Sequence, residues 1–190
     1  MAYANTLIAG FSGTSETQFG AKGYAFGAYG QAGAWDSTYA GIMNITTLFK
    51  LLGAPLHNNR WSWGATRPDG TVVLRVWAET VFQIDGARYV QVLGRDWENI
   101  AERMESGNLG FGERQRHVEL LEGGAHCILI MCQCVDPKSL DGWSIKTFDS
   151  KDVFIGGDVI RRDGVRNQYV EGREGVFVRL ARRLPVGQVI

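Results

Sequence analysis

The chain has 190 residues, of which 45% are apolar and 21% charged. This ordinary globular composition excludes a wholly disordered or fibrous chain. A chain of this length buries about 70% of the surface that it exposes when unfolded, so it needs no disulfide framework to fold. The formal net charge is zero and the isoelectric point is near 6.8, so no overall basic field indicates a nucleic-acid partner.

The longest nearly uncharged run, residues 125–135, has about half the length that a membrane-spanning helix needs. The first residues lack the basic and apolar regions of a secretory signal. We therefore expect a cytoplasmic protein with no membrane partner. The three cysteines lie close together, which also favours a reducing compartment over a secreted disulfide framework. Arginine outnumbers lysine fifteen to five, and from Lys151 onward eight basic residues face five acidic ones, so any basic surface is local.

Residues 1–35 hold seven glycines and seven aromatic residues. Such a segment has too many glycines for a regular helix and too many rings for a flexible linker, so it predicts an irregular N-terminal arm with a strand at residues 6–11. Asp36 is the expected N-cap of a helix that runs to Leu52 and ends at Gly53 and Pro55. Its apolar stripe comprises Tyr39, Ile42, Met43, Leu48, Phe49 and Leu52.

Three strands follow at residues 61–66, 71–84 and 87–93, separated by the turns 67–70 and 85–86. They predict an antiparallel meander. Helices are expected at residues 97–104 and 112–121. The second helix is expected to turn some residues inward (Val118, Leu120, Leu121) and others mostly outward (Glu113, Arg114, Arg116, Glu119).

Residues 125–135 are apolar on both faces, which indicates a central strand. Short strands are predicted at residues 143–148, 153–155, 158–162, 165–170 and 175–180, and no two strands show a clear βαβ crossover. Residues 36–190 therefore predict a single α+β domain. We expect a small, partly closed antiparallel β-barrel of roughly eight strands, decorated with two or three helices.

The segment 126–134 contains His126, Cys127, Cys132 and Cys134. A structural zinc site takes its ligands as pairs from two separate segments, and the sequence has no second Cys or His pair. Buried, unreactive thiols in a central strand are therefore favoured over zinc. Neither a nucleophile-elbow motif nor a phosphate-binding loop occurs. The sequence predicts no metal and no cofactor.

A metal-dependent nuclease gathers two acids and a lysine at strand ends. Asp136 and Lys138 follow the central strand with the required spacing, and Asp69 supplies an upstream acid. These three are the candidate catalytic residues of a second hypothesis, a metal-dependent restriction nuclease. A third hypothesis is a protein-interaction domain.

The strongest candidate site is segment 57–63, His-Asn-Asn-Arg-Trp-Ser-Trp, with a few residues around it. Asparagine pairs with adenine, arginine pairs with guanine, and indoles stack on bases. We assign base reading to Asn58, Asn59, Arg60 and Arg75, and stacking to Trp61, Trp63 and Trp77. We assign contacts with backbone phosphates to Arg67, Arg114, Arg116 and His117. The competing interpretation is structural, with indoles in the core and helix charges paired on a solvated face.

Five stretches, residues 56–65, 73–77, 110–118, 145–148 and 153–157, resemble PUA-like β-barrel readers, the group that includes EVE and SRA domains. These readers serve bacterial modification-dependent restriction systems. The resemblance covers about residues 52–184 and implies a flipped or edge-read base held by aromatic residues, with cleavage done by a separate or fused nuclease domain. A B3-like pseudobarrel fits the strand count nearly as well. The leading hypothesis is a DNA-binding recognition module that reads sequence or a modified base in duplex DNA.

Overall fold

The computed structural model describes residues 43–94, 109–139, 143–167 and 170–190. The chain divides into two compact units, Met1–Ser37 and Thr38–Ile190. The first unit, with the predicted arm and its strand at residues 6–11, lies outside the described residues, and so does the predicted helix at residues 97–104. None of the described helices has the length and apolar character needed to cross a membrane.

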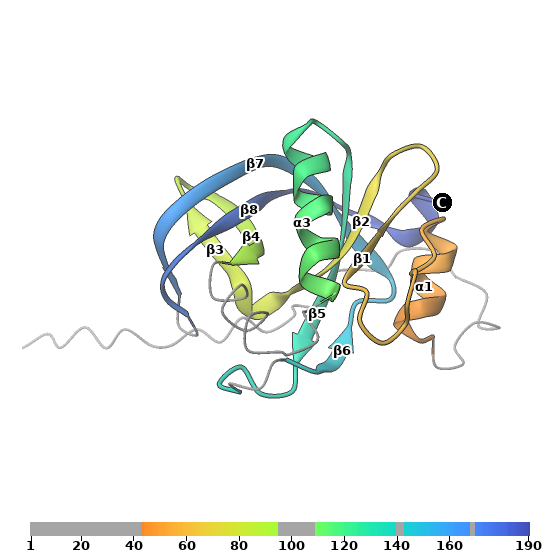
Figure 1. Cartoon of the computed structure of the whole chain (residues 1–190), viewed down its shortest axis with the longest axis horizontal. Coiled ribbons are helices and arrows are strands. Elements are labelled where there is room, and N and C mark those ends of the chain that lie inside the picture. Colours follow the sequence, from red (N-terminus) through yellow and green to blue (C-terminus); the bar gives the residue numbers. More distant parts are fainter. Residues whose placement is uncertain (1–42, 95–108, 140–142, 168–169) are drawn as a thin grey trace, which may run out of the picture. The chain divides into compact units, whose positions relative to one another are not determined.

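The second unit is an α+β structure with one mixed eight-stranded sheet (Figure 1). Its strands are β1 (Gly64–Thr66), β2 (Val72–Trp77), β3 (Val81–Ile84), β4 (Ala87–Gly94), β5 (Cys127–Cys134), β6 (Ile145–Phe148), β7 (Asp152–Asn167) and β8 (Val170–Pro185). The strand order is β1-β2-β5-β7-β8-β4-β3, and β6 also pairs with β5. The central position predicted for residues 125–135 is confirmed, because β5 pairs with three strands.

The predicted α+β class with about eight strands is confirmed, whereas the predicted barrel is not. The sheet stays open, because the terminal strands β1 and β3 do not pair with each other in the described structure. The sheet is also not purely antiparallel as expected, because β2 and β5 run parallel, from the pair Val72 and Cys127 to the pair Trp77 and Cys132. Residue patterns identify strands, but they do not name the partner of each strand.

The predicted three-stranded meander is two separate hairpins. The 3-10 helix η2 (Ala78–Thr80) interrupts the predicted strand 71–84, and the Thr80 hydroxyl donates to the Trp77 carbonyl at 3.0 Å. As a result, β1 pairs with β2 at one end of the sheet and β3 pairs with β4 at the other. The Asp85-Gly86 turn between β3 and β4 is confirmed, with φ angles of 48° and 80°.

The short strands predicted between residues 153 and 180 form one hairpin of two 16-residue strands, β7 and β8. The glycines that suggested breaks mark register shifts instead, including one between Ile155 and Gly156. A Cβ atom on Gly156 would lie 2.7 Å from the Cβ of Cys127, so glycine allows β7 to pass close to β5. Because a bulge bends a strand without ending it, β7 and β8 continue through the positions where the sequence predicted breaks.

The first described helix, α1 (Ile45–Leu51), begins later than predicted. Its N-cap is Asn44 rather than Asp36, because the Asn44 side-chain oxygen accepts the Thr47 N–H at 2.8 Å and residues 43–44 are not helical. Leu48, Phe49 and Leu52 are fully buried, as the stripe predicted. They pack with Val73, Ile128 and Ile130 on one face of the sheet.

The second described helix, α3 (Leu109–Glu122), contains the predicted helix 112–121. Val118 and Leu121 pack against apolar residues of β2, β4, β5 and β8 on the other face of the sheet. Figure 1 shows α3 in green between β4 and the β1–β2 hairpin, which belong to the two ends of the sheet that do not pair with each other. Three orientations predicted for α3 are wrong, because Leu120 is 45% exposed whereas Glu113 and Arg114 are 8% and 2% exposed.

Candidate functional site

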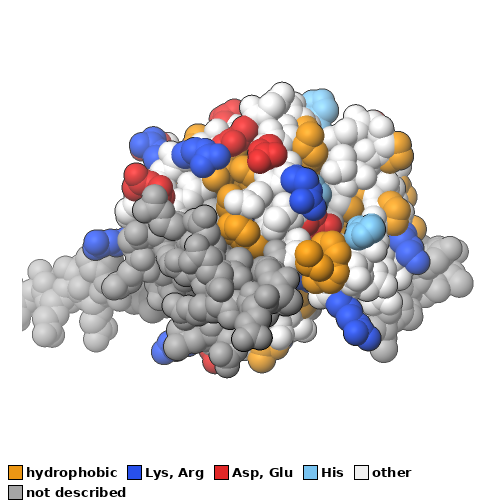
Figure 2. Space-filling view, viewed as in Figure 1, with side chains coloured by type: hydrophobic (Ala, Val, Ile, Leu, Met, Phe, Trp, Pro, Cys, Tyr) orange, Lys and Arg blue, Asp and Glu red, His pale blue; other side chains and the backbone are white. Residues whose placement is uncertain are grey.

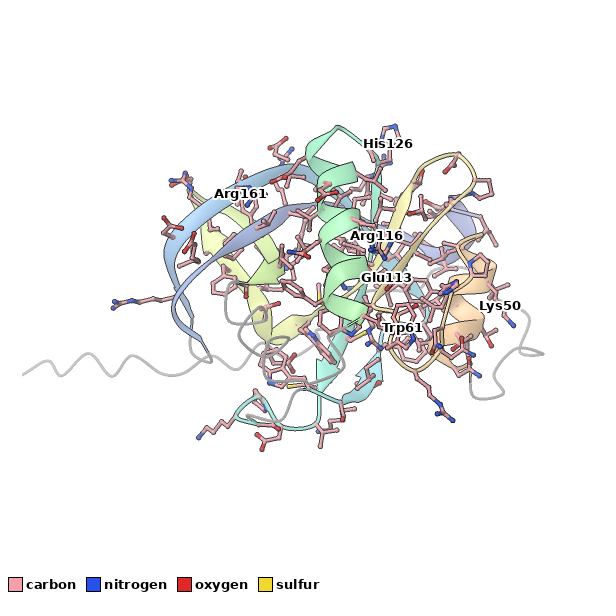
Figure 3. All side chains as sticks on the ribbon, in the orientation of Figure 1. Lys50, Trp61, Glu113, Arg116, His126 and Arg161 are labelled. Carbon is pink, nitrogen blue, oxygen red and sulfur yellow. The ribbon has the colours of Figure 1, made fainter. Side chains whose placement is uncertain are left out.

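An open pocket of about 440 Å³ lies between segment 55–66 and the middle of α3. It is lined by Pro55, His57, Trp61, Gly64, Ala65, Thr66, Glu113, Arg116 and His117. Figure 2 shows apolar, basic and histidine side chains adjoining on this face of the protein. In Figure 3, Glu113 and Arg116 point from α3 toward the β1 side, with Trp61 close to the start of the helix.

Glu113 anchors α3 to the segment that leads into β1. Its carboxylate accepts the Ser62 hydroxyl at 2.9 Å and the Trp63 N–H at 2.8 Å. Ser62 is only 1% exposed, and its hydroxyl oxygen accepts the Asn58 N–H at 3.0 Å. One buried carboxylate therefore fixes the backbone of residues 58–63, which form a wall of the pocket. Sequence reasoning missed this role because the bonded residues lie about fifty positions apart.

Gly110 allows α3 to approach that segment closely. A Cβ atom at this position would lie 2.6 Å from the Trp61 carbonyl oxygen and 2.8 Å from the Trp63 indole nitrogen. The Trp63 ring is therefore packed against the first turn of α3 rather than lining the pocket.

Arg114 bridges the open side of the sheet. One of its terminal nitrogens donates to the Val92 carbonyl at 3.3 Å, and the other donates to the carbonyls of Trp63 and Arg75, each at 2.8 Å. Burial, followed by the nearby cation of Arg75, lowers the pKa of Arg114 to about 9. The phosphate contact expected for Arg114 is corrected, since this side chain is 2% exposed and donates to backbone carbonyls.

His117 forms a buried part of the pocket wall. The residue is 6% exposed, and its ring carbon Cε1 lies 3.2 Å from the position that a Cβ would take on Gly64. Burial, with smaller contributions from Arg114 and Arg116, lowers the pKa of His117 to about 4. The imidazole is therefore neutral at pH 7. Its Nδ1 atom is buried and has no hydrogen-bond partner.

The rim of the pocket is aromatic and basic. The half-buried Trp61 ring meets the exposed His57 ring edge to face, with 5.8 Å between centroids. Arg116 is exposed, and no acidic side chain of the described residues forms an ion pair with it. Asn59 and Arg60 are exposed on the adjoining turn, whereas the Asn58 side chain accepts the Arg60 N–H at 2.9 Å and so shapes that turn.

The other predicted DNA-binding residues lie outside the pocket lining. Trp77 packs against the apolar core on the α1 side of the sheet and meets Trp143 edge to face at 5.6 Å, so its expected stacking on a base is corrected to a core contact. Arg75 is half-buried, and burial lowers its pKa. Arg67 donates to the Val189 carbonyl at 3.2 Å and lies 3.7 Å from Asp69.

The candidate nuclease residues are not gathered. Asp69 precedes β2 and Asp136 follows β5, so they flank opposite ends of this parallel pair. Six paired residues at about 3.3 Å each put roughly 17 Å between those ends. Each carboxylate instead shapes its own turn, Asp69 by accepting the Thr71 N–H and Asp136 by accepting the Lys138 N–H, each at 2.9 Å. The nuclease site formed by Asp69, Asp136 and Lys138 is therefore contradicted.

All three cysteines are free and buried, which confirms the structural interpretation of these thiols. Cys127 and Cys132 belong to cores on opposite faces of the sheet, because side chains alternate along a strand. Among the described residues, no three His, Cys, Asp or Glu side chains are arranged to hold a metal ion. His126 is exposed.

The thiols are expected to resist modification in the folded protein. Burial raises the pKa of Cys127 and Cys132 to about 12 and that of Cys134 to about 11, so almost no thiolate exists at pH 8. An aromatic disulfide reagent should titrate none of the three within minutes in buffer and all three in denaturant. Rapid reaction of one thiol in the native protein would contradict this burial.

Comparisons with protein-family models, with curated proteins and with solved structures find no match for this chain. The assignment of the site therefore depends on the geometry of its residues alone. Of the predicted site residues, Trp61, Arg116 and His117 meet in one pocket. Two further lining residues, His57 and Glu113, had no assigned site role in the sequence prediction.

Proposed function

We propose that the chain is a DNA-recognition module of a restriction-type system, and that it contacts duplex DNA through the face around this pocket. The observation that carries the proposal is the meeting of Trp61, His117 and Arg116 in one open pocket, where no acidic side chain of the described ranges forms an ion pair with Arg116. Nucleic-acid-binding sites combine aromatic rings, on which bases stack, with guanidinium groups, which bind phosphates. The resemblance of residues 52–184 to PUA-like readers points to the same function.

The distribution of charge supports this face over the β7–β8 hairpin. Three arginines of the hairpin are held in ion pairs, with Arg161 at 2.7 Å from Glu122, Arg162 at 2.9 Å from Asp85, and Arg183 at 2.7 Å from Asp149. The one carboxylate in the pocket lining, Glu113, already accepts two internal hydrogen bonds. The pocket face therefore keeps positive charge for a polyanion although the whole chain is neutral.

The roles are revised accordingly. Asn59 and Arg60, on the exposed turn, are proposed to contact base edges, and Trp61 to stack on a base. Arg116 is proposed to bind a backbone phosphate. A volume of about 440 Å³ lies within the range of ligand pockets and accommodates one nucleobase, so a modified base is a suitable target.

Titration of labelled duplexes at two salt concentrations tests this function. The duplexes carry plain, methylated or hydroxymethylated cytosine in one sequence context. Affinity should rise as salt falls, because bound phosphates release their counterions. Absence of salt-dependent binding to every duplex would refute the DNA-binding function.

Replacing Arg116 with glutamine should weaken duplex binding about 5- to 10-fold, equally for all sequences, and reduce the salt slope by about one. The matched control is Lys138→Gln, which removes one exposed positive charge from the turn after β5. Fluorescence anisotropy at several salt concentrations measures both quantities. Equal losses in the two variants would place the contact elsewhere.

A further inference from the structure

Positive charge exceeds negative charge around the pocket, and part of the excess is buried. The guanidinium groups of Arg75 and Arg114 both interact electrostatically with Glu113, and Arg116 lies one turn further along α3. Glu113 thus offsets one of the two guanidiniums behind the pocket lining, and Arg116 adds a further positive charge in the lining itself. Arg114 is 2% exposed and bonds to carbonyl oxygens, with no carboxylate in ion-pair contact among the described residues. The single charge of Glu113 cannot balance both guanidiniums, and an uncompensated buried cation is unfavourable, so an anion in the adjacent pocket would stabilise this arrangement.

A second observation points to a ligand in the same place. His117 lines the pocket and is only 6% exposed, and its Nδ1 atom has no hydrogen-bond partner. Buried polar atoms in native proteins are nearly always hydrogen-bonded, and an exception requires an explanation. Because Nδ1 is itself buried, a ligand in the pocket would supply the missing hydrogen bond after a turn of the imidazole ring that brings this atom to the pocket surface.

The size and rim of the pocket define the ligand further. About 440 Å³ is more than a lone phosphate fills and is suited to a whole nucleotide. The Trp61 ring at the rim offers a surface for a base. A phosphomonoester carries nearly two negative charges at pH 7, which matches the local excess. A phosphodiester within a strand carries one charge and is flanked by sugars on both sides, so it enters a pocket less readily than a terminal group.

We propose that the pocket binds a nucleotide bearing a phosphomonoester, either the phosphorylated end of a DNA strand or a free mononucleotide. The phosphate lies against Arg116 and His117, and the base lies against Trp61. This inference names the ligand of the pocket and rests on the proposed DNA-binding function only for the strand-end form.

Duplexes that differ only in their ends test the inference. One duplex has 5′-hydroxyl ends, a second has 5′-phosphates and a third has 3′-phosphates. A phosphorylated end should bind at least 10-fold more tightly than a hydroxyl end. Deoxycytidine monophosphate should compete for the protein, whereas deoxycytidine should not. Equal affinity for all three duplexes, with no competition by the monophosphate, overturns the inference.

Variants locate the preference. Arg116→Gln and His117→Leu should each abolish it, and Lys138→Gln should leave it unchanged. Because His117 is buried, the thermal melting of its variant is checked first, and Arg116→Gln, an exposed substitution, decides the matter if that variant is unfolded. Retention of the end preference by Arg116→Gln also overturns the inference.

The outcomes separate the two proposals. Salt-dependent binding to all duplexes without an end preference leaves the DNA-binding function intact and refutes the phosphomonoester site. Binding of the monophosphate without binding of any duplex supports the pocket ligand and refutes the DNA-binding function.

Discussion

Replacing Glu113 with alanine is expected to destabilise the folded protein by about 3–5 kcal/mol. The substitution leaves the Ser62 hydroxyl and the Trp63 N–H, at 2.9 and 2.8 Å from the carboxylate, without their acceptor. Each buried donor without a partner costs about 1–3 kcal/mol. The substitution also removes the negative charge that interacts with the buried Arg114. Urea unfolding at pH 7 measures the change.

Two further substitutions at this helix make the result specific. Glu119→Ala removes an exposed carboxylate from α3 and should change stability by no more than about 0.5 kcal/mol. Glu113→Gln keeps one acceptor oxygen, so its loss of stability should lie between those of Glu113→Ala and Glu119→Ala. If Glu113→Ala unfolds within about 1 kcal/mol of Glu119→Ala, the carboxylate does not hold the segment before β1.

Elements defined by local patterns were predictable from the sequence. Residues 125–135 are apolar on both faces, and β5 is the buried strand that this pattern predicts. The Asp85-Gly86 turn and the helix at residues 112–121 follow from equally local signals. Strand partners were not predictable, because the parallel pairing of β2 with β5 joins segments about fifty residues apart. Nor does a glycine indicate whether it ends a strand or bends it, as Gly156 does in β7.

The same limit applies to the site. Trp77 was assigned to base stacking, but the sequence does not show that its side of the sheet is covered by an apolar core, against which the indole packs. Arg114 and His117 were assigned to backbone phosphates, a role that requires exposed side chains. Both are buried, because the carbonyls at the open side of the sheet provide Arg114 with partners that no local pattern predicts. Trp61 and Arg116, whose positions require only a surface loop and an exposed helix face, both line one pocket.

Lowering the pH from 7 to 4.5 is expected to cost the folded state about 2.5 kcal/mol through His117 alone. The pKa of this imidazole falls from an ordinary value of 6.5 to about 4 on folding, chiefly because the ring is buried and then because Arg114 and Arg116 repel a further positive charge. Above pH 6.5 the ring is neutral in both states and its titration costs nothing. As the pH falls from 6.5 toward 4, the unfolded chain takes up a proton that the folded protein does not, so stability decreases.

Urea unfolding of the wild type and of His117→Leu at pH 7, 6, 5 and 4.5 isolates this contribution, because the carboxylates common to both proteins cancel in the difference. The stability of the wild type should fall about 2.5 kcal/mol further than that of the variant across this range. Replacing the exposed His126 with asparagine should leave the wild-type decrease unchanged. Parallel curves for the wild type and His117→Leu would mean that the ring is protonated in the folded state well above pH 4. The pocket wall would then carry a positive charge where a neutral ring is now expected.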